Sequence, residues 1–519
     1  MKQDFQLPYI SRRGFLQRTL PAALGATVLS NTIRDLRILN TAMAQGAPLT
    51  DYKALICVFL NGGNDSNNMI IPTIPSEWDN YAAIRSAALA IPNTDGGPAT
   101  ALALNSKNGM PGFPSNDNHT YGFHPAMPEL KNLFNQGFVA PVFNVGTLSF
   151  PLTKAQYSTG SVPRPPQLFS HSDQQTQWQT SLPDQPYTSG WGGRLADLLS
   201  SPVDVNSGGQ VSMAVTLAGS NIFEVGNVNA APQYAISTSG AVTLSSTVTG
   251  ARQTALQAFL NTNKASTDLQ TQAYAQVMDH SIFEAGILSF ALAAQGTPSW
   301  FSRFPTTITT PNGGSTFTSG LMSQMKMVAR LIELGSRSVA AGGLGMRRQI
   351  FFIQVGGYDT HTNQTNNAGQ STTDNVKVVI GGHANLLAEL SQSLNALHLA
   401  MSDIGTLRGT PNILRDAVTS FTVSDFARTF SCNGSGSDHG WGGHHLVVGG
   451  AVKGGATYGK FPTLTVNGPD DTGIGRWIPT TSVDQYAATL ATWFGVDSNN
   501  LDIVFPNLGR FSSSNLGFI

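Results

Sequence analysis

The chain has 519 residues, a formal net charge of −1 and only 11% charged residues, well under the roughly 25% typical of soluble domains. Ser, Thr, Asn, Gln and Gly fill many of the polar positions instead. The sequence lacks the basic patch or stripe that nucleic-acid binding requires, so no nucleic-acid partner is expected.

The N-terminal segment 1–44 has the features of a twin-arginine export signal. Ser-Arg-Arg-Gly-Phe-Leu occupies residues 11–16, a mildly apolar run follows at 20–29, and Ala42-Met43-Ala44 offers a cleavage site. The apolar run is shorter than the roughly 20 residues that span a bilayer, and we expect no later stretch to be long and apolar enough. We therefore predict export by the twin-arginine translocase, a periplasmic or secreted location, and a mature chain, 45–519, without a stable membrane span.

Strand-like and helical patterns alternate along the mature chain. Short continuous apolar runs, typical of buried parallel strands, occupy 54–60, 139–145, 349–355, 420–423 and 445–448. Helical patterns occupy 321–335, 383–404 and 484–494. The alternation predicts one large α/β domain with a mostly parallel sheet and helices on both of its faces.

Two stretches interrupt this pattern. The segment at about 206–250 is rich in Ser, Thr, Gly, Asn and Val with short alternating runs, and it predicts a β-rich insertion or cap. The polar, Pro-containing stretch at about 297–320 predicts a surface loop.

Cys57 and Cys432 are the only cysteines. An oxidising compartment permits a bridge between them, but Cys57 lies in an apolar run, where a buried free thiol is commoner.

Asp and His residues gather where the predicted strands end, which is where open α/β sheets bind their ligands. Asp65 follows the first run, Asp359 and His361 follow the third, and Asp425 and later His439 follow the fourth. An acidic residue after a strand is more often a helix N-cap than a ligand. Such a set in a chain so poor in charge nevertheless predicts a divalent metal ion, because Asp and His supply its ligands. The metal's identity (zinc, manganese, magnesium or calcium) is left open.

Several motifs occur here in the order expected for one family: Leu-Asn-Gly-Gly-Asn-Asp at 60–65, His124-Pro125, Gly-Gly-Tyr-Asp-Thr-His at 356–361, Ser-Asp-Phe-Ala-Arg-Thr at 424–429 and Asp-His-Gly-Trp-Gly at 438–442. Together they resemble the bacterial domain of unknown function 1501 family, whose members commonly carry twin-arginine signals. The resemblance implies an alkaline-phosphatase-like α/β/α sandwich with one or two divalent metals at the strand ends.

The resemblance also implies roles for individual residues. Asp65 would be the first-strand metal ligand, Asp359 and His361 would belong to one metal site, and Asp425 would belong to the second. His439 would return to the first site. A nucleophilic serine would lie at a helix start, with Ser170 slightly preferred over Ser172. Arg428 would clamp the anionic ester substrate.

The sequence departs from the family pattern at Phe426, where relatives have a histidine, so one expected ligand is missing. His439 or His171 would substitute, or the second site would be weak or absent.

The sequence is compatible with two functions. The first is an exported metal-dependent hydrolase of phosphate or sulfate esters with a serine nucleophile. The alternative is a non-catalytic envelope assembly or binding protein on the same metal-binding fold.

Other conspicuous residues have ordinary structural interpretations. We expect His124 to be a buried, hydrogen-bonded histidine that starts a helix at Pro125, and His444 and His445 to be structural. Trp191 and Trp441 would pack in the core. Asp173 and Asp438 are second-choice ligands, and we expect them to be helix caps or partners of metal ligands.

Overall fold

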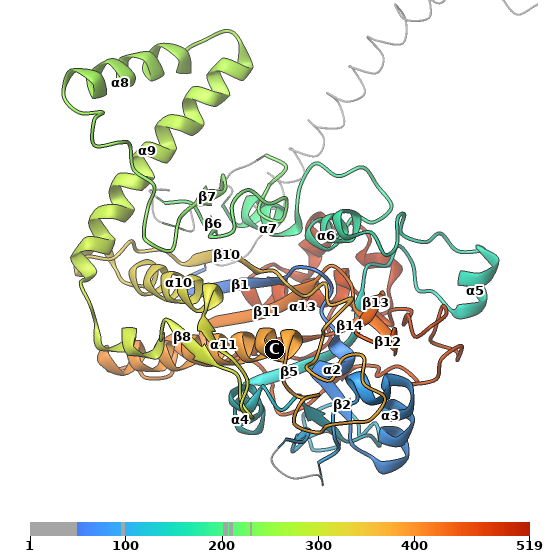
Figure 1. Cartoon of the computed structure of the whole chain (residues 1–519). Helices are drawn as coiled ribbons and strands as arrows, with labels where there is room; N and C mark the ends of the chain where they lie inside the picture. Colours follow the sequence, from blue (N-terminus) through green and yellow to red (C-terminus); the bar gives the residue numbers. More distant parts are fainter. Residues whose placement is uncertain (1–48, 95–98, 201–205, 207–210, 229–230) are drawn as a thin grey trace, which may run out of the picture.

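The computed structural model describes residues 49–94, 99–200, 206, 211–228 and 231–519 (Figure 1). The predicted export signal therefore lies outside the described residues. Within them, nine strands form one central sheet in the order β15-β5-β14-β11-β1-β10-β6-β7, with β16 also paired to β5. All neighbouring strands in this sheet are parallel, except that β14 is antiparallel to both β11 and β5. The predicted α/β class with a mostly parallel sheet is confirmed.

The five predicted strands are all present in the sheet: β1 (Lys53–Leu60), β5 (Val139–Gly146), β10 (Arg348–Val355), β11 (Val418–Ser424) and β14 (Gly443–Gly449). Four shorter strands complete it: β6 (Ala214–Thr216), β7 (Tyr234–Ala235), β15 (Tyr458–Gly459) and β16 (Thr481–Ser482). The longer strands are buried along most of their length, which explains their continuous apolar sequences.

Helices cover both faces of the sheet, and β1 shows how alternate residues face the two layers. Ile56 and Val58 pack in a core with α4 (Pro128–Gln136), α10 (Gly320–Ser336) and α11 (Gly382–Leu407). Cys57 and Phe59 pack in the opposite core with α7 (Trp191–Ser200) and α13 (Val483–Phe494). The structure is therefore layered α/β/α. The three predicted helices correspond to α10, α11 and α13 and are confirmed.

The register of the central strands defines the edge at which the candidate site forms. Leu60 of β1 pairs with Val355 of β10 and with Ser424 of β11, so all three strands end at the same level. Beyond this edge lie α2 (Ser66–Met69), α3 (Pro75–Leu89), α6 (His171–Thr180) and the hairpin of β12 (Arg428–Cys432) and β13 (Ser437–His439).

The remaining short elements lie around this frame. A small antiparallel sheet contains β2 (Ile70–Pro72), β3 (Leu102–Ala103) and β4 (Tyr121–Phe123). The other short helices are α5 (Lys154–Thr159), α12 (Ile413–Asp416), α14 (Leu501–Val504), η2 (Val339–Ala341), η3 (Ser498–Asn500) and η4 (Leu508–Arg510).

The two interrupting stretches differ in detail from their sequence patterns. In the described part of 206–250, β6 and β7 extend the central sheet from β10 rather than forming a sheet of their own. The stretch 297–320, expected as a loop, contains η1 (Ser299–Arg303) and a hairpin of β8 (Thr307–Thr309) and β9 (Thr316–Thr318).

A projecting helical arm, formed by α8 (Ala251–Lys264) and α9 (Leu269–Gln295), has no counterpart in the sequence-based predictions (Figure 1). By length and composition, α9 meets the criteria for a membrane-spanning helix, and 28% of its most apolar window is buried inside the molecule. The expectation that no stretch after the signal would meet these criteria was wrong. One such helix is weak evidence for a span, because core helices of soluble proteins also meet them.

Candidate metal centre

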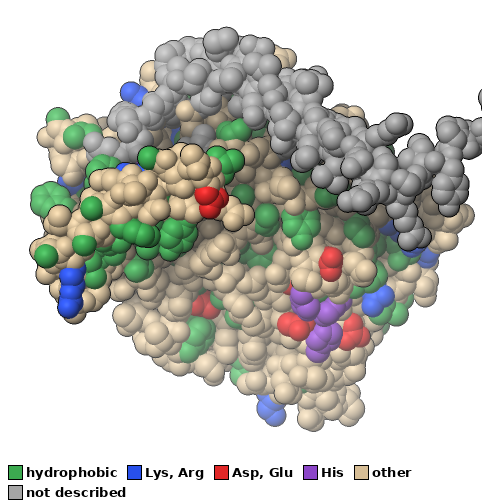
Figure 2. Space-filling model, turned by 90° about the horizontal axis from the view of Figure 1, so that it is seen from above, with side chains coloured by type: hydrophobic (Ala, Val, Ile, Leu, Met, Phe, Trp, Pro, Cys, Tyr) green, Lys and Arg blue, Asp and Glu red, His purple; other side chains and the backbone are tan. Residues whose placement is uncertain are grey.

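A cluster of histidines lies at the edge where β1, β10 and β11 end. His361 lies in the segment after β10, His439 ends β13, and His171 begins α6. Figure 2 shows the histidines together on one face of the molecule, bordered by acidic and basic side chains. The fold therefore brings segments from three distant parts of the chain to one exposed place.

Three imidazoles surround the carboxylate of Asp359. His361 Nε2 lies 2.9 Å from His439 Nε2, and these two atoms lie 3.1 and 3.5 Å from Asp359 Oδ1. His171 Nε2 lies 3.6 Å from Asp359 Oδ2. Ligands about 2.1 Å from one ion are themselves roughly 3.0–3.4 Å apart, and these separations lie in that range or within about 0.2 Å of it, so a small shift of the side chains would suit a shared cation. The ligand atoms of His171, Asp359 and His439 all lie within 4.8 Å of one another.

Each imidazole is oriented by an acceptor at its other nitrogen. His439 Nδ1 donates to the carbonyl of Phe169 at 2.7 Å. His171 Nδ1 donates to Asp425 Oδ2 at 2.6 Å, and His361 Nδ1 donates to Asp438 Oδ1 at 3.1 Å. Carbonyls and ionised carboxylates only accept hydrogen bonds, so each neutral ring carries its proton on Nδ1 and a lone pair on Nε2. Metal-ligating histidines are commonly held in this way.

The Nε2 lone pairs of the three imidazoles lie close to one another and to the carboxylate of Asp359, so a cation between them would be favourable. Among the described residues, the buried Nε2 of His171 has no hydrogen-bond partner, and the Nε2 atoms of His361 and His439 face each other. The hydrogen bond from His171 to Asp425 raises the pKa of His171 despite the opposing effect of burial. Burial, together with the nearby cationic groups, lowers the pKa of His439. A metal cation among these atoms would replace lone-pair repulsion by coordination, so the residues fit such an ion.

Asp359 is the only acidic member of this group, and Arg428 holds it in its ionised form. Arg428 Nη1 donates to Asp359 Oδ1 at 2.7 Å. Burial raises the pKa of Asp359, but the hydrogen bond and charge of Arg428, with the charges of His361 and His171, outweigh burial and lower the pKa overall. The free side of the carboxylate, Oδ2, faces His171.

Aromatic and strained residues support the imidazoles. The ring of Phe426, which is buried, lies 4.8 Å from the ring of His171 and 4.6 Å from that of His439. The resemblance implied a histidine at this position, but the phenyl ring packs against two of the three candidate imidazoles and adds no ligand. Phe169 adopts a φ of +72°, which is unusual for a bulky residue, and this conformation directs its carbonyl to His439.

Asp425 lies next to the group as a partner of His171. Its carboxylate accepts from His171 Nδ1, from Gln175 Nε2 at 3.0 Å and from the backbone N–H of Gly62 at 3.2 Å. These contacts use the carboxylate to orient His171, so a direct ligand role, as the resemblance implied for a second metal, is not what the geometry favours.

Asp65 is separated from the histidine cluster and is paired inside the protein. It is fully buried, and its Oδ2 accepts hydrogen bonds from Arg85 and Gln364. Arg85 is also fully buried and donates to the backbone carbonyls of Thr429 and Phe430. The positive charge beside Asp65 is therefore a side chain of the protein, which disfavours a second cation there.

The two candidate nucleophiles flank His171 at the start of α6. Ser170 Oγ donates to Asp173 Oδ2 at 2.5 Å, and Ser172 Oγ lies 3.4 Å from both Ser170 Oγ and the same carboxylate oxygen. In the described part of the chain, neither serine hydrogen-bonds to a histidine of the cluster or to Asp359. Asp173, expected as a cap or partner, is thus the partner of both hydroxyls.

The residues expected to be structural are structural. His124 is buried and its Nδ1 accepts the N–H of Ala126, although the helix that follows begins at Pro128 rather than Pro125. His444 and His445 lie inside β14, where burial lowers the pKa of each to about 3. Trp191 and Trp441 are each 2% exposed. Cys57 is a buried free thiol, and Cys432 is also free.

Sequence reasoning understated His171 and did not consider Arg85 or the carbonyl of Phe169. The sequence suggested His171 only as a substitute for the histidine that is missing at Phe426, not as one of the main ligand candidates. The first position of a helix at a strand edge was the available indication that its side chain would enter the site. Nothing in the local sequence of α3 indicated that Arg85 would reach Asp65.

Comparison with known protein families identifies the family of this chain. A family model described as "Protein of unknown function (DUF1501)" matches residues 52–503, which is most of the chain, so the chain belongs to this family. A comparison with curated proteins found no match.

Proposed function

Because the family itself has no described function, the site must suggest one, and we propose that this chain is an exported metal-dependent hydrolase of phosphate or sulfate esters. One observation carries the proposal. Three imidazoles, each with its Nδ1 proton engaged, direct their Nε2 atoms toward the carboxylate of Asp359. A divalent ion at this place would supply a Lewis acid for an oxygen of the ester.

The donor atoms narrow the choice of metal. His171, His361 and His439 would contribute nitrogen and Asp359 would contribute oxygen. Calcium and magnesium prefer all-oxygen surroundings, whereas imidazole suits zinc and other transition metals. We therefore propose zinc in a single site, with manganese, which suits the carboxylate of Asp359, as the alternative. Asp425 and Asp438 would be partners that orient two of the histidines.

The residues of the first turn of α6 suit nucleophilic attack. Ser170 Oγ already donates to Asp173, so a base is in place to accept the hydroxyl proton. Ser170 remains the preferred nucleophile and Ser172 the alternative. Support for an alkaline-phosphatase-like fold comes from the layered architecture, the mostly parallel sheet and the position of the site at the strand ends. The proposed twin-arginine export would let the metal be acquired before translocation.

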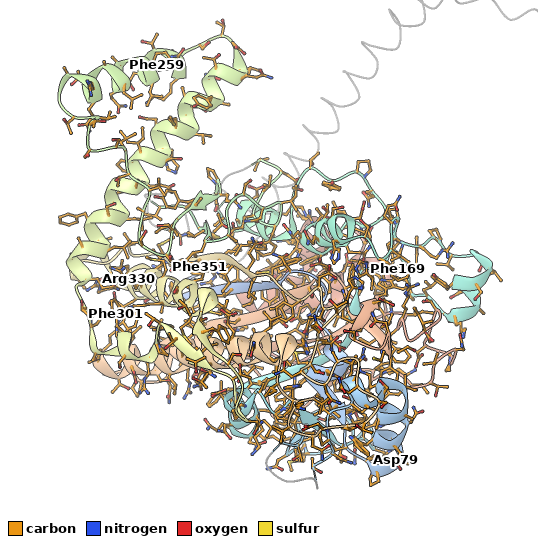
Figure 3. All side chains as sticks on the ribbon, in the orientation of Figure 1. Asp79, Phe169, Phe259, Phe301, Arg330 and Phe351 are labelled. Carbon is orange, nitrogen blue, oxygen red and sulfur yellow. The ribbon has the colours of Figure 1, made fainter. Side chains whose placement is uncertain are left out.

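A second candidate function, an assembly or binding protein of the cell envelope, is favoured by the exposed apolar side chains of the α8–α9 arm. Large exposed apolar residues on it are Phe259, Leu269, Tyr274, Val277, Phe283 and Phe290. Figure 3 shows Phe259 on α8, at the outer end of the arm. Apolar patches of this kind commonly mark interaction surfaces, and both functions can reside in one chain.

Metal content and turnover test the proposal together. Purified mature chain is expected to contain about one zinc or manganese ion and to hydrolyse aryl phosphates or aryl sulfates. His439→Ala should lose both properties. His119→Ala, which removes a histidine paired with Glu77 away from this site, should retain them. A chain that binds no metal and turns over neither ester would overturn the hydrolase proposal. If Ser170→Ala and Ser172→Ala both kept full activity, the serine nucleophile would be wrong.

A further inference from the structure

The resemblance assigned substrate binding to Arg428, but the contacts of Arg428 leave it little freedom to bind an external anion. Its side chain is fully buried. Nε and Nη2 both donate to the carbonyl of Ser437, and Nη1 donates to the carbonyl of Gly62 and to Asp359. Arg428 therefore holds the strand ends and the metal-site carboxylate together, and another cation is needed for the substrate.

Arg476 lies beside the same site, and its guanidinium makes fewer hydrogen bonds to the protein than that of Arg428. Its Nε donates to the carbonyl of His439 at 2.8 Å, and its guanidinium carbon lies 4.3 Å from the centre of the Phe169 ring. The side chain is partly exposed. One N–H of five is used in this contact, so the two Nη groups remain able to donate to a ligand.

A buried carboxylate fixes the loop that presents Arg476. Asp471 is fully buried and accepts four backbone N–H groups, those of Asn467, Gly473, Gly475 and Arg476, at 2.7–3.0 Å. Such a carboxylate holds the loop in one conformation, so that Arg476 is positioned before any ligand arrives.

Phe169 links this arginine to the metal site. Its carbonyl orients the imidazole of His439, and its ring packs against the guanidinium of Arg476. Arg476 in turn donates to the backbone carbonyl of His439. Phe169, His439 and Arg476 therefore all contact one another, and these contacts fix the guanidinium of Arg476 relative to the candidate ligand His439.

We infer that Arg476 is the substrate's anion-binding residue, which receives the charged oxygens of a tetrahedral phosphate or sulfate ester at the site of His171, Asp359, His361 and His439. This inference rests on the proposed function and narrows it, because a neutral ester would gain nothing from Arg476. A planar guanidinium with two free Nη groups can donate to two oxygens of one phosphate or sulfate.

Direct binding of inorganic phosphate and of inorganic sulfate to the zinc-loaded mature chain, measured separately by calorimetry, tests the inference. Arg476→Gln is expected to weaken binding of the preferred anion roughly 10- to 100-fold while zinc content stays unchanged. Arg476→Lys should lose less, because it keeps the charge without the fork. Arg303→Gln, which changes an exposed arginine paired with Asp403, should bind the anion as the natural chain does.

The outcomes separate this inference from the proposed function. If the natural chain takes up no metal, both fail. If it takes up zinc and Arg476→Gln binds phosphate and sulfate as tightly as the natural chain, Arg476 is not the anion-binding residue, although the hydrolase proposal survives. Whichever anion, phosphate or sulfate, binds more tightly to the natural chain identifies the class of ester that the enzyme hydrolyses. As a check on positioning, Phe169→Leu keeps the carbonyl and removes the ring, so it should weaken anion binding while zinc remains bound.

Discussion

Asp65 and Asp359 both follow central strands, and the sequence suggests the same role for each, yet their surroundings differ. Asp65 is fully buried and receives Arg85 and Gln364 on one oxygen. Asp359 has a side chain that is 47% exposed and faces three imidazoles. Each carboxylate pairs with an arginine of the protein, Arg85 at Asp65 and Arg428 at Asp359, but only Asp359 also lies among the lone pairs of imidazoles.

The surroundings of the two carboxylates distinguish a structural acidic residue from a metal ligand. Both positions satisfy the rule that ligands gather at strand ends. An arginine lies beside both carboxylates, so the deciding feature is the set of histidines that the fold brings to Asp359 from α6, β13 and the segment after β10. Variants that remove each partner in turn test whether Asp65 and Asp359 differ in this way.

The largest effect is expected from removing the internal cation of Asp65. Arg85→Ala leaves a buried carboxylate without its partner and should lower the free energy of unfolding by about 3–5 kcal/mol. Arg303→Ala breaks an exposed pair with Asp403 and should cost at most about 1 kcal/mol. Urea unfolding of the two variants measures both. Equal, small losses would show that Asp65 does not depend on Arg85.

A third kind of carboxylate extends the comparison, because Glu224 has no cationic partner in the part of the chain that the structure describes and lies away from the cluster. It is buried and accepts only from the amides of Asn221 and Gln233, at 3.0 and 2.8 Å. Burial raises its pKa to about 7, from 4.5. The folded chain therefore binds the proton more tightly than the unfolded chain, and stability should fall as pH rises through this interval.

The expected fall attributable to Glu224 is about 3 kcal/mol between roughly pH 4.5 and pH 7, with full stabilisation below that window. Glu224→Gln should remove this part of the pH dependence, whereas Asp502→Asn, at an exposed position, should leave it unchanged. Unfolding free energies at several pH values provide the measurement. An identical slope in the natural chain and in Glu224→Gln would mean that Glu224 is ionised in the folded protein.

Chelation should separate Asp65 from Asp359. A metal at about 100 times its dissociation constant stabilises the folded chain by about 2.7 kcal/mol. We expect a chelator to remove this increment from the natural chain and from Asp65→Asn, but to have no effect on Asp359→Asn. Thermal unfolding with and without chelator tests the expectation. Loss of the chelator effect in Asp65→Asn would place Asp65 at the metal after all.

The sequence predicted the central frame well because its physical basis is local. Continuous apolar runs identify strands that are buried on both faces, and β1, β5, β10, β11 and β14 all lie where these runs occur. Gathering of Asp and His at the strand ends was also predictable. The pairing of Asp65 with Arg85 was not predictable, because Asp65 precedes α2 and Arg85 lies in α3, and no local pattern encodes that the fold brings the two together.

The strands, helices and site residue that were not predicted all lack a local sequence pattern strong enough to indicate them. The strands β6 and β7 have only three and two residues, which is too short for a pattern to show. The helices of the arm are exposed on most sides, so α8 has only one buried residue, Leu260, and no clear amphipathic repeat. The role of His171 depends on where the first turn of α6 is placed, which the sheet determines and the local sequence does not.

The smallest of these effects tests whether Asp425 acts through His171 rather than on the metal. Asp425→Asn keeps the size of the side chain and removes the charge that orients His171 Nδ1 at 2.6 Å. Loss of such a partner typically weakens metal binding 10- to 100-fold, or about 1.4–2.8 kcal/mol. Asp438→Asn, at a half-exposed carboxylate 3.1 Å from His361, should cost less. Competition for zinc with a chromophoric chelator measures both variants. Complete loss of zinc in Asp425→Asn would show that Asp425 is a ligand, and the partnership with His171 would then be secondary.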